Sequence, residues 1–172
     1  MAKGKGEDKV NFTKVSDAGS IKRTAVLAVE IWTGHYTAII GKEQVEYMLE
    51  KFQSPEAIAE QIRQGYAYYI IEEGGRGAGY LAVTARGSEL YISKLYVKKE
   101  MRGRGIGRSA VVFIGELAQR GNFSVLALNV NRGNTSSIEA YKKFGFRVIR
   151  EEKNSIGSGF FMDDLIMEKI LK

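Results

Sequence analysis

The amino-acid sequence predicts an α/β fold with a mixed central sheet of about six or seven strands, flanked by about four or five helices. Some segments repeat apolar residues at helical spacing, and short runs rich in β-branched and aromatic residues separate these segments. The predicted order is β-α-α-β-β-β-α-β-α-β-β. Because no linker rich in proline or serine divides the 172 residues, we expect one domain over 10–172, preceded by a flexible N-terminus over 1–9.

Signals for helix starts and stops define the first part of the chain. We expect a strand over 11–15, a helix capped by Ser16 and Asp17 that is interrupted over 33–41 and resumes over 42–52, and a helix from Ser54-Pro55-Glu56 to Gly65. Serine and aspartate side chains accept hydrogen bonds from the free N–H groups of the first turn, and proline suits the first helical position. A glycine after a helix readily takes the left-handed conformation that ends it.

The rest of the chain alternates strands with two helices. We expect strands over 66–73, 78–86, 89–97, 124–130, 146–152 and 159–171, and helices from 106 to Gly121 and from 134 to Gly145. The first two of these strands form a hairpin around the turn GGRG. The run SVLALNV is apolar on both faces, which is typical of a buried central strand.

Charge and cysteine content exclude several classes of function. The net charge is +6, but the longest purely basic run is two residues and Lys and Arg often stand beside Glu, which argues against nucleic-acid binding. No apolar run suits a membrane helix, and the charged start MAKGKGEDKV lacks the apolar core of a signal peptide, so we expect no membrane partner. The absence of cysteine excludes disulfides and cysteine metal sites and fits the cytoplasm, and no His, Asp and Glu cluster has metal-ligand spacing.

The stretch RGRGIG, residues 102–107, joins an apolar strand to a helix. Amide groups at a helix N-terminus attract anions, glycine lets the backbone approach a ligand closely, and arginine adds donors that suit phosphate. The stretch therefore favours a pyrophosphate. It lacks the Lys-Ser/Thr pair of a P-loop, and Arg108 stands where a dinucleotide-binding fingerprint has its third glycine. Taken alone, it also fits a glycine-rich surface turn.

A second block of sequence distinguishes these alternatives. From residue 89 onward the chain resembles the GNAT superfamily of N-acetyltransferases, whose acetyl-CoA loop reads Arg/Gln-x-x-Gly-x-Gly/Ala. The matching residues are Arg102, Gly105 and Gly107 in the loop, then Asn134, Tyr141 and Gly145-Phe146 in NTSSIEAYKKFGF. The resemblance covers roughly residues 78–152, and it implies the GNAT fold with acetyl-CoA as cosubstrate.

The resemblance also implies a reaction and the residues that perform it. A primary amine, on a polyamine, an amino acid or a protein, would attack acetyl-CoA directly in a ternary complex. The implied acetyl-CoA contacts are Leu95, Tyr96, Val97, Arg102, Gly103, Arg104, Gly105, Ile106, Gly107, Arg108 and Asn134. Tyr141 would act as the general acid that protonates the departing thiolate; core packing is the alternative role for this side chain.

The general base and the acceptor pocket are less defined. Many relatives carry a glutamate on the fourth strand, where this chain has Tyr91 and Ser93. Glu30, Glu89 or bulk water could serve instead, and the missing carboxylate leaves open a second function, a catalytically weak acyl-CoA-binding or sensor module.

The segment around Trp32, His35 and Tyr36 is where relatives bind the acceptor, although Trp32 also fits the core and His35 also fits a hydrogen-bonding role. The acidic residues 43, 46 and 50 fit a solvated helix face, with contact to a cationic acceptor as the alternative. Because GNAT members often pair through their C-terminal strands, a homodimer is an option for this chain.

Overall fold

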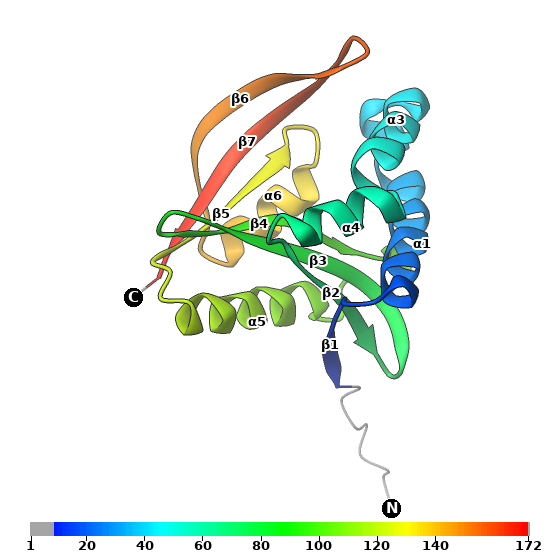
Figure 1. Ribbon diagram of the computed structural model, residues 1–172. Coiled ribbons are helices and arrows are strands. Elements are labelled where there is room, and N and C mark those ends of the chain that lie inside the picture. The colour runs from blue at the N-terminus through cyan, green and yellow to red at the C-terminus, as the bar shows by residue number, and fades with distance from the viewer. Residues whose placement is uncertain (1–8, 172) are drawn as a thin grey trace, which may run out of the picture.

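The computed structural model describes residues 9–171 and shows one seven-stranded sheet with helices on both faces (Figure 1). Residues 1–8, which make up most of the expected flexible N-terminus, lie outside the described residues. The strands are β1 (Val10–Lys14), β2 (Ala67–Glu73), β3 (Arg76–Arg86), β4 (Glu89–Val97), β5 (Val125–Asn131), β6 (Arg147–Gly157) and β7 (Phe160–Ile170). The helices are α1 (Ala18–His35), α2 (Thr37–Ile40), α3 (Lys42–Gln53), α4 (Pro55–Arg63), α5 (Ile106–Arg120) and α6 (Thr135–Lys143), with a short 3₁₀ turn, η1 (Lys99–Met101). The mixed sheet of the predicted fold class is confirmed.

The helix boundaries follow the capping residues seen in the sequence. The Asp17 side chain accepts a hydrogen bond from the Ser20 N–H at 2.7 Å and completes a capping box, and Ser54 caps α4 with Pro55 in its first turn. The expected interruption over 33–41 is shorter than predicted, because α1 continues to His35 and α2 adds one further turn.

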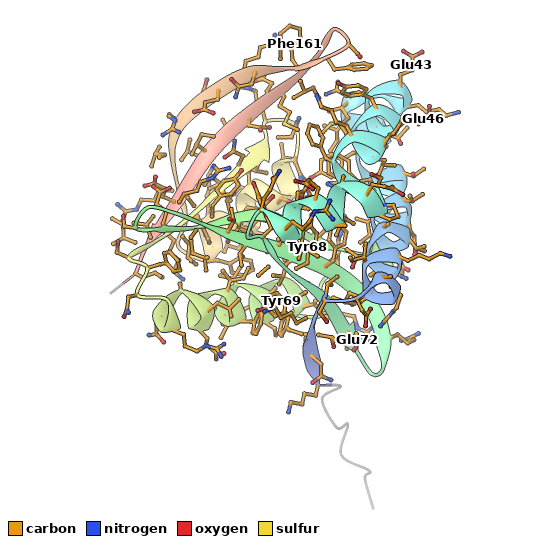
Figure 2. The ribbon with its side chains drawn as sticks, viewed as in Figure 1. Glu43, Glu46, Tyr68, Tyr69, Glu72 and Phe161 are labelled. Carbon is orange, nitrogen blue, oxygen red and sulfur yellow. The ribbon has the colours of Figure 1, made fainter. Side chains whose placement is uncertain are left out.

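The sheet separates two apolar cores. Its strand order is β1-β2-β3-β4-β5-β7-β6. Helices α1, α3 and α4 cover one face and α5 and α6 cover the other (Figure 1). Tyr68 and Tyr69, neighbours on β2, point to opposite faces of the sheet (Figure 2), because side chains alternate along a strand.

The central strands β4 and β5 part halfway along their length. They pair in parallel only where Glu89–Ile92 lies beside Val125–Leu128. Next to this point β4 carries a bulge in its pairing with β3. Ala82 pairs with Lys94 and Val83 pairs with Ile92, so Ser93 has no partner residue on β3. The bulge turns Lys94 and Tyr96 toward the face covered by α1, α3 and α4. The second half of β4 is thus left without a partner on the β5 side.

The hairpin formed by β6 and β7 reaches across to α3. The Tyr47 hydroxyl donates to the Ile156 carbonyl oxygen at 2.7 Å, and the Gln44 side chain donates to the Phe161 carbonyl oxygen at 2.7 Å. Figure 2 shows Phe161 near the turn that joins β6 to β7, close to the start of α3. The hairpin and α3 therefore close one side of the space opened by the two central strands.

Candidate active site

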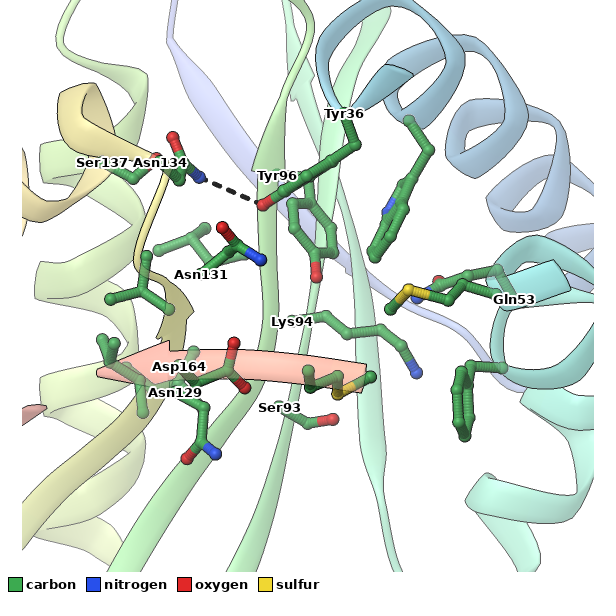
Figure 3. Close-up of a pocket in the computed structure, with 18 of the residues that line it drawn as sticks. Tyr36, Gln53, Ser93, Lys94, Tyr96, Asn129, Asn131, Asn134, Ser137 and Asp164 are labelled. Atoms are coloured by element: carbon green, nitrogen blue, oxygen red, sulfur yellow. Dashed lines mark hydrogen bonds between the residues drawn. The ribbon is translucent and has the colours of Figure 1, made fainter. Parts of the chain in front are cut away.

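Two adjoining cavities occupy the space where β4 and β5 part. The first, the loop cavity, measures about 580 Å³ and is lined by the RGRGIG stretch, the second half of β4 and α6. The second, the polar cavity, measures about 380 Å³ and is lined by α3, α4, β4, β5 and β7 (Figure 3). The residues that line both cavities are Tyr36, Leu95, Tyr96, Asn134, Ser137 and Tyr141.

The glycine stretch presents free backbone donors to the loop cavity. Gly103 and Gly105 have φ of +74° and +81°, a left-handed conformation that side chains rarely tolerate. Gly105 precedes α5 without a side-chain cap, and the first helical hydrogen bond runs from the Ser109 N–H to the Gly105 carbonyl oxygen. The N–H groups of residues 106–108 precede that bond, so they are available to an anion.

The arginines around this stretch have different roles. Arg102 lines the loop cavity, where its Nε donates to the Val97 carbonyl oxygen at 3.0 Å. Arg108 also lines this cavity, but Arg104 does not: it turns to Glu73 at the end of β2, with 3.0 Å between Nη1 and Oε2. Arg104 therefore ties the glycine stretch to the sheet.

A chain of polar side chains links the loop cavity to the polar cavity. Arg102 Nη1 lies 3.2 Å from His35 Nδ1, and His35 Nε2 lies 3.1 Å from Asn134 Oδ1. Because a guanidinium only donates, Nδ1 accepts and the Nε2–H donates to Asn134. Asn134 Nδ2 in turn donates to the Tyr36 hydroxyl at 3.1 Å (Figure 3). The Tyr36 oxygen is an acceptor in this contact, so its own proton can point toward a ligand.

The two tyrosines at the junction stay protonated at neutral pH. Burial raises the pKa of Tyr36 to about 12, and burial also raises the pKa of Tyr141, with a smaller contribution from the neighbouring Tyr36. The Tyr141 ring packs edge-on against Phe146, with 5.5 Å between ring centroids. Tyr141 thus supports the core and also faces both cavities.

The polar cavity contains one buried carboxylate and one buried ammonium. Asp164, on β7 opposite Asn131, is 9% exposed, and burial raises its pKa while a hydrogen bond with Asn129 partly offsets this effect. Lys94, on β4, is 5% exposed, and burial lowers its pKa to about 7.

Comparison with known proteins identifies the family. Residues 36–163 match the family profile described as an acetyltransferase (GNAT) domain. The chain belongs to the GNAT acetyltransferase family. The predicted family, fold class and enzyme class are therefore confirmed, with acetyl-CoA as the cosubstrate of this class of enzyme.

Individual relatives agree with this assignment. A peptidyl-lysine N-acetyltransferase of Salmonella typhimurium is 26% identical over 112 residues, which cover 64% of this chain and 71% of the relative. A thialysine N-epsilon-acetyltransferase of Bos taurus is 33% identical over 78 residues, but these cover only 45% of this chain and 46% of the relative. The crystal structure of PaiA N-acetyltransferase from Thermoplasma acidophilum, in complex with coenzyme A, superimposes with a TM-score of 0.80 at 20% identity, over 95% of this chain and 99% of that one.

The structure brings most of the predicted GNAT site residues together. Leu95, Tyr96, Val97, Asn134 and Tyr141 line the loop cavity, as do the residues of the RGRGIG stretch other than Arg104. Of the predicted acceptor residues, His35 and Tyr36 belong to the polar chain. Trp32 lines the polar cavity, where its Nε1 donates to the Tyr80 hydroxyl at 3.2 Å.

Neither predicted base reaches a cavity. Glu30 is exposed and pairs with Lys98 at 3.1 Å, while Glu89 lies at the paired end of β4, opposite Val125. Neither residue lines either cavity within the described part of the chain. Likewise, the acidic residues 43, 46 and 50 are exposed on α3.

Sequence reasoning missed Asp164 and Lys94. Asp164 belongs to an Asp-Asp pair inside the strand FFMDDLIM, where alternation places one of the two carboxylates on the inner face. Lys94 interrupts the apolar run YISKLYV, and a lone lysine in such a run is a signal of a buried polar contact.

Within residues 9–171, no helix combines the length and apolar character needed to span a membrane. In the same range, His, Cys, Asp and Glu side chains form no group of three or more that could hold a metal ion.

Proposed function

We propose that the protein transfers an acetyl group from acetyl-CoA to a primary amine by direct attack in a ternary complex. The junction of the two cavities at Tyr141 carries this proposal, because donor and acceptor can meet there without passing through solvent. Donor and acceptor then reach the reacting centre from opposite sides.

The loop cavity is the proposed donor site. The free N–H groups of residues 106–108 would bind the pyrophosphate, with Arg102 and Arg108 as charged donors. Backbone groups of Leu95–Val97, unpaired on the β5 side, would hydrogen-bond the pantetheine arm. A backbone N–H near Leu95 would also polarise the thioester carbonyl.

The polar cavity is the proposed acceptor site. Asp164 would accept a proton from the ammonium, directly or through water, since an amine attacks only when neutral. The neutral nitrogen would then attack the thioester carbon, the carbon–sulfur bond would break, and the thiolate would take the proton of the Tyr141 hydroxyl. The proton that the new amide nitrogen loses would return to the Tyr141 oxygen through water, which restores the hydroxyl. The names of the relatives, a peptidyl-lysine and a thialysine acetyltransferase, suggest either a protein lysine or a small amine as acceptor.

Free-thiol release with acetyl-CoA and a panel of amines tests this proposal. Tyr141→Phe should lower kcat about 100-fold, because it removes a general acid, while acetyl-CoA binding is unchanged. Tyr69→Phe is the matched control, since Tyr69 packs against Phe113 on α5 and lines neither cavity. An unchanged kcat in Tyr141→Phe would refute the role of Tyr141.

Acetyl-CoA binding without thiol release from any amine would favour the second candidate, an acyl-CoA-binding or sensor module. The observation that supports this candidate is that β4 carries Tyr91 and Ser93 where many relatives carry a glutamate. A cytoplasmic location and a homodimer stay predictions.

A further inference from the structure

The ammonium group of Lys94 is buried without an anionic partner. Its Nζ donates to Gln61 Oε1 and to the Tyr68 hydroxyl oxygen, both of which are neutral acceptors. No carboxylate of the described chain lies within 4 Å of it. An ammonium has three N–H donors, so one remains for another acceptor. A buried charge without a counter-charge is costly, and a bound anion would offset this cost.

A second donor stands near Lys94. Gln53 lines the same cavity, and its Oε1 accepts a hydrogen bond from the Tyr80 hydroxyl at 2.9 Å. This contact fixes the amide plane and leaves its NH₂ group to donate elsewhere. Figure 3 shows Gln53 on the same side of the cavity as the Lys94 amino group. Together these two side chains provide donors suited to a carboxylate.

Asp164 provides the opposite charge elsewhere in the cavity. Figure 3 shows the Lys94 side chain extending away from Asp164, and the two residues form no ion pair. The negative charge of Asp164 contributes to the raised pKa of Tyr36, which lines both cavities. The carboxylate is thus on the side of the proposed reacting centre, whereas the ammonium is on the side of α3 and α4.

We propose that the polar cavity selects an acceptor that carries both an amine and a carboxylate, with the amine toward Asp164 and the carboxylate toward Lys94 and Gln53. Such an acceptor is a small amino acid, and it supplies the counter-charge that each buried group lacks. A diamine would instead bring a second ammonium toward Lys94, and like charges repel in a buried site. This inference rests on the proposed acetyl transfer and specifies its substrate class.

Three amines with five carbon atoms each test the selection. Pentylamine, 5-aminopentanoate and cadaverine each have a primary amine on a five-carbon chain, and they differ at the other end, which is apolar, anionic or cationic. We expect kcat/KM to fall from 5-aminopentanoate to pentylamine to cadaverine, with shorter and longer ω-amino acids and α-amino acids included to find the best spacing. If no amino acid surpasses its matched alkylamine, or if cadaverine is the best acceptor, the inference is wrong.

A substitution identifies the residue responsible. Lys94→Met keeps a long side chain without the charge and should reduce kcat/KM for the best amino acid about 10- to 100-fold, the range for losing a charged hydrogen bond. The ratio of kcat/KM for this amino acid to kcat/KM for pentylamine should therefore fall by a similar factor, because the apolar end of pentylamine gains nothing from the charge of Lys94. Lys22→Met, on the exposed side of α1, is the control and should change neither. A preference for amino acids that persists in Lys94→Met would overturn the assignment.

Calorimetry separates this inference from the proposed function. In the presence of coenzyme A, the parent protein should bind 5-aminopentanoate, or the best-fitting amino acid of the series, and Lys94→Met should bind it more weakly. If acetyl-CoA releases no thiol with any amine, the proposed acetyl transfer is refuted, while this binding result still decides the role of Lys94. If thiol release occurs and amino acids do not bind, acetyl transfer stands and the inference fails.

Discussion

Replacing Lys94 by methionine should stabilise the folded protein at low pH, and this gain should shrink as the pH rises. The unfolded chain holds the lysine proton up to a pH near the ordinary pKa of 10.5, whereas burial lowers the pKa in the folded chain to about 7. Each pKa unit is worth about 1.4 kcal/mol, so the folded chain disfavours the charged form by up to about 5 kcal/mol. That cost is complete below pH 7, shrinks between pH 7 and 10.5, and is absent above.

The substitution also removes the hydrogen bonds from Lys94 to Gln61 and Tyr68, which offsets part of the gain. We therefore expect Lys94→Met to exceed the parent in unfolding free energy by about 1–4 kcal/mol at pH 6, and by much less at pH 10. Urea unfolding of both proteins at the two pH values measures the difference, with Lys22→Met as a control that should show none. A difference that is equal at pH 6 and pH 10 would refute the reasoning, because only a titrating group in the folded state makes it change.

Three further substitutions test other parts of the structure. Asp164→Asn should lower kcat/KM about 100-fold, because it removes the proposed base. In the parent protein the rate should fall at low pH as Asp164 is protonated, at a pH above the ordinary pKa of 3.8 because burial raises the pKa of this group, and in Asp164→Asn this fall should be absent. Burial lowers the pKa of His35, so below the ordinary value of 6.5 the unfolded chain binds a proton more readily than the folded chain does. Thermal melts of the parent should therefore show a loss of stability as the pH falls from about 7.5 to about 5.5. The same melts of His35→Gln should lack this part of the loss. Gly79→Ala should cost about 1–3 kcal/mol in urea unfolding, because its Cβ would overlap the Tyr96 carbonyl oxygen, whereas Gly77→Ala meets only ordinary contacts.

Local signals predicted the fold and the part of the candidate site around the RGRGIG stretch. Caps such as Asp17 and Ser54, and the left-handed glycines of the RGRGIG stretch, act within a few residues of their own position, so the sequence reveals them directly. The predicted interruption over 33–41 is longer than the observed one, because Gly34 and the β-branched residues nearby have low helix propensity. In the structure, packing of Trp32 and Tyr36 in the core outweighs this low propensity.

The acceptor side could not be predicted in the same way. Whether Lys94 faces the helices or the opposite core depends on a bulge at Ser93 that only strand pairing reveals. Similarly, alternation shows that one of Asp163 and Asp164 faces inward, but the register of β7 against Asn131 decides which one reaches the cavity.

In the proposed function, Arg102 would keep donor binding and acceptor chemistry compatible in one site. A guanidinium has five N–H donors, and Arg102 uses one on the Val97 carbonyl oxygen and one on His35. The remaining donors can bind a phosphate without releasing His35, so the chain through Asn134 keeps holding the Tyr36 hydroxyl while the donor is bound. A lysine at this position would supply charge but could not hold the same fixed, planar set of contacts. Arg102 would therefore bind the donor and also keep the junction between the two cavities in place.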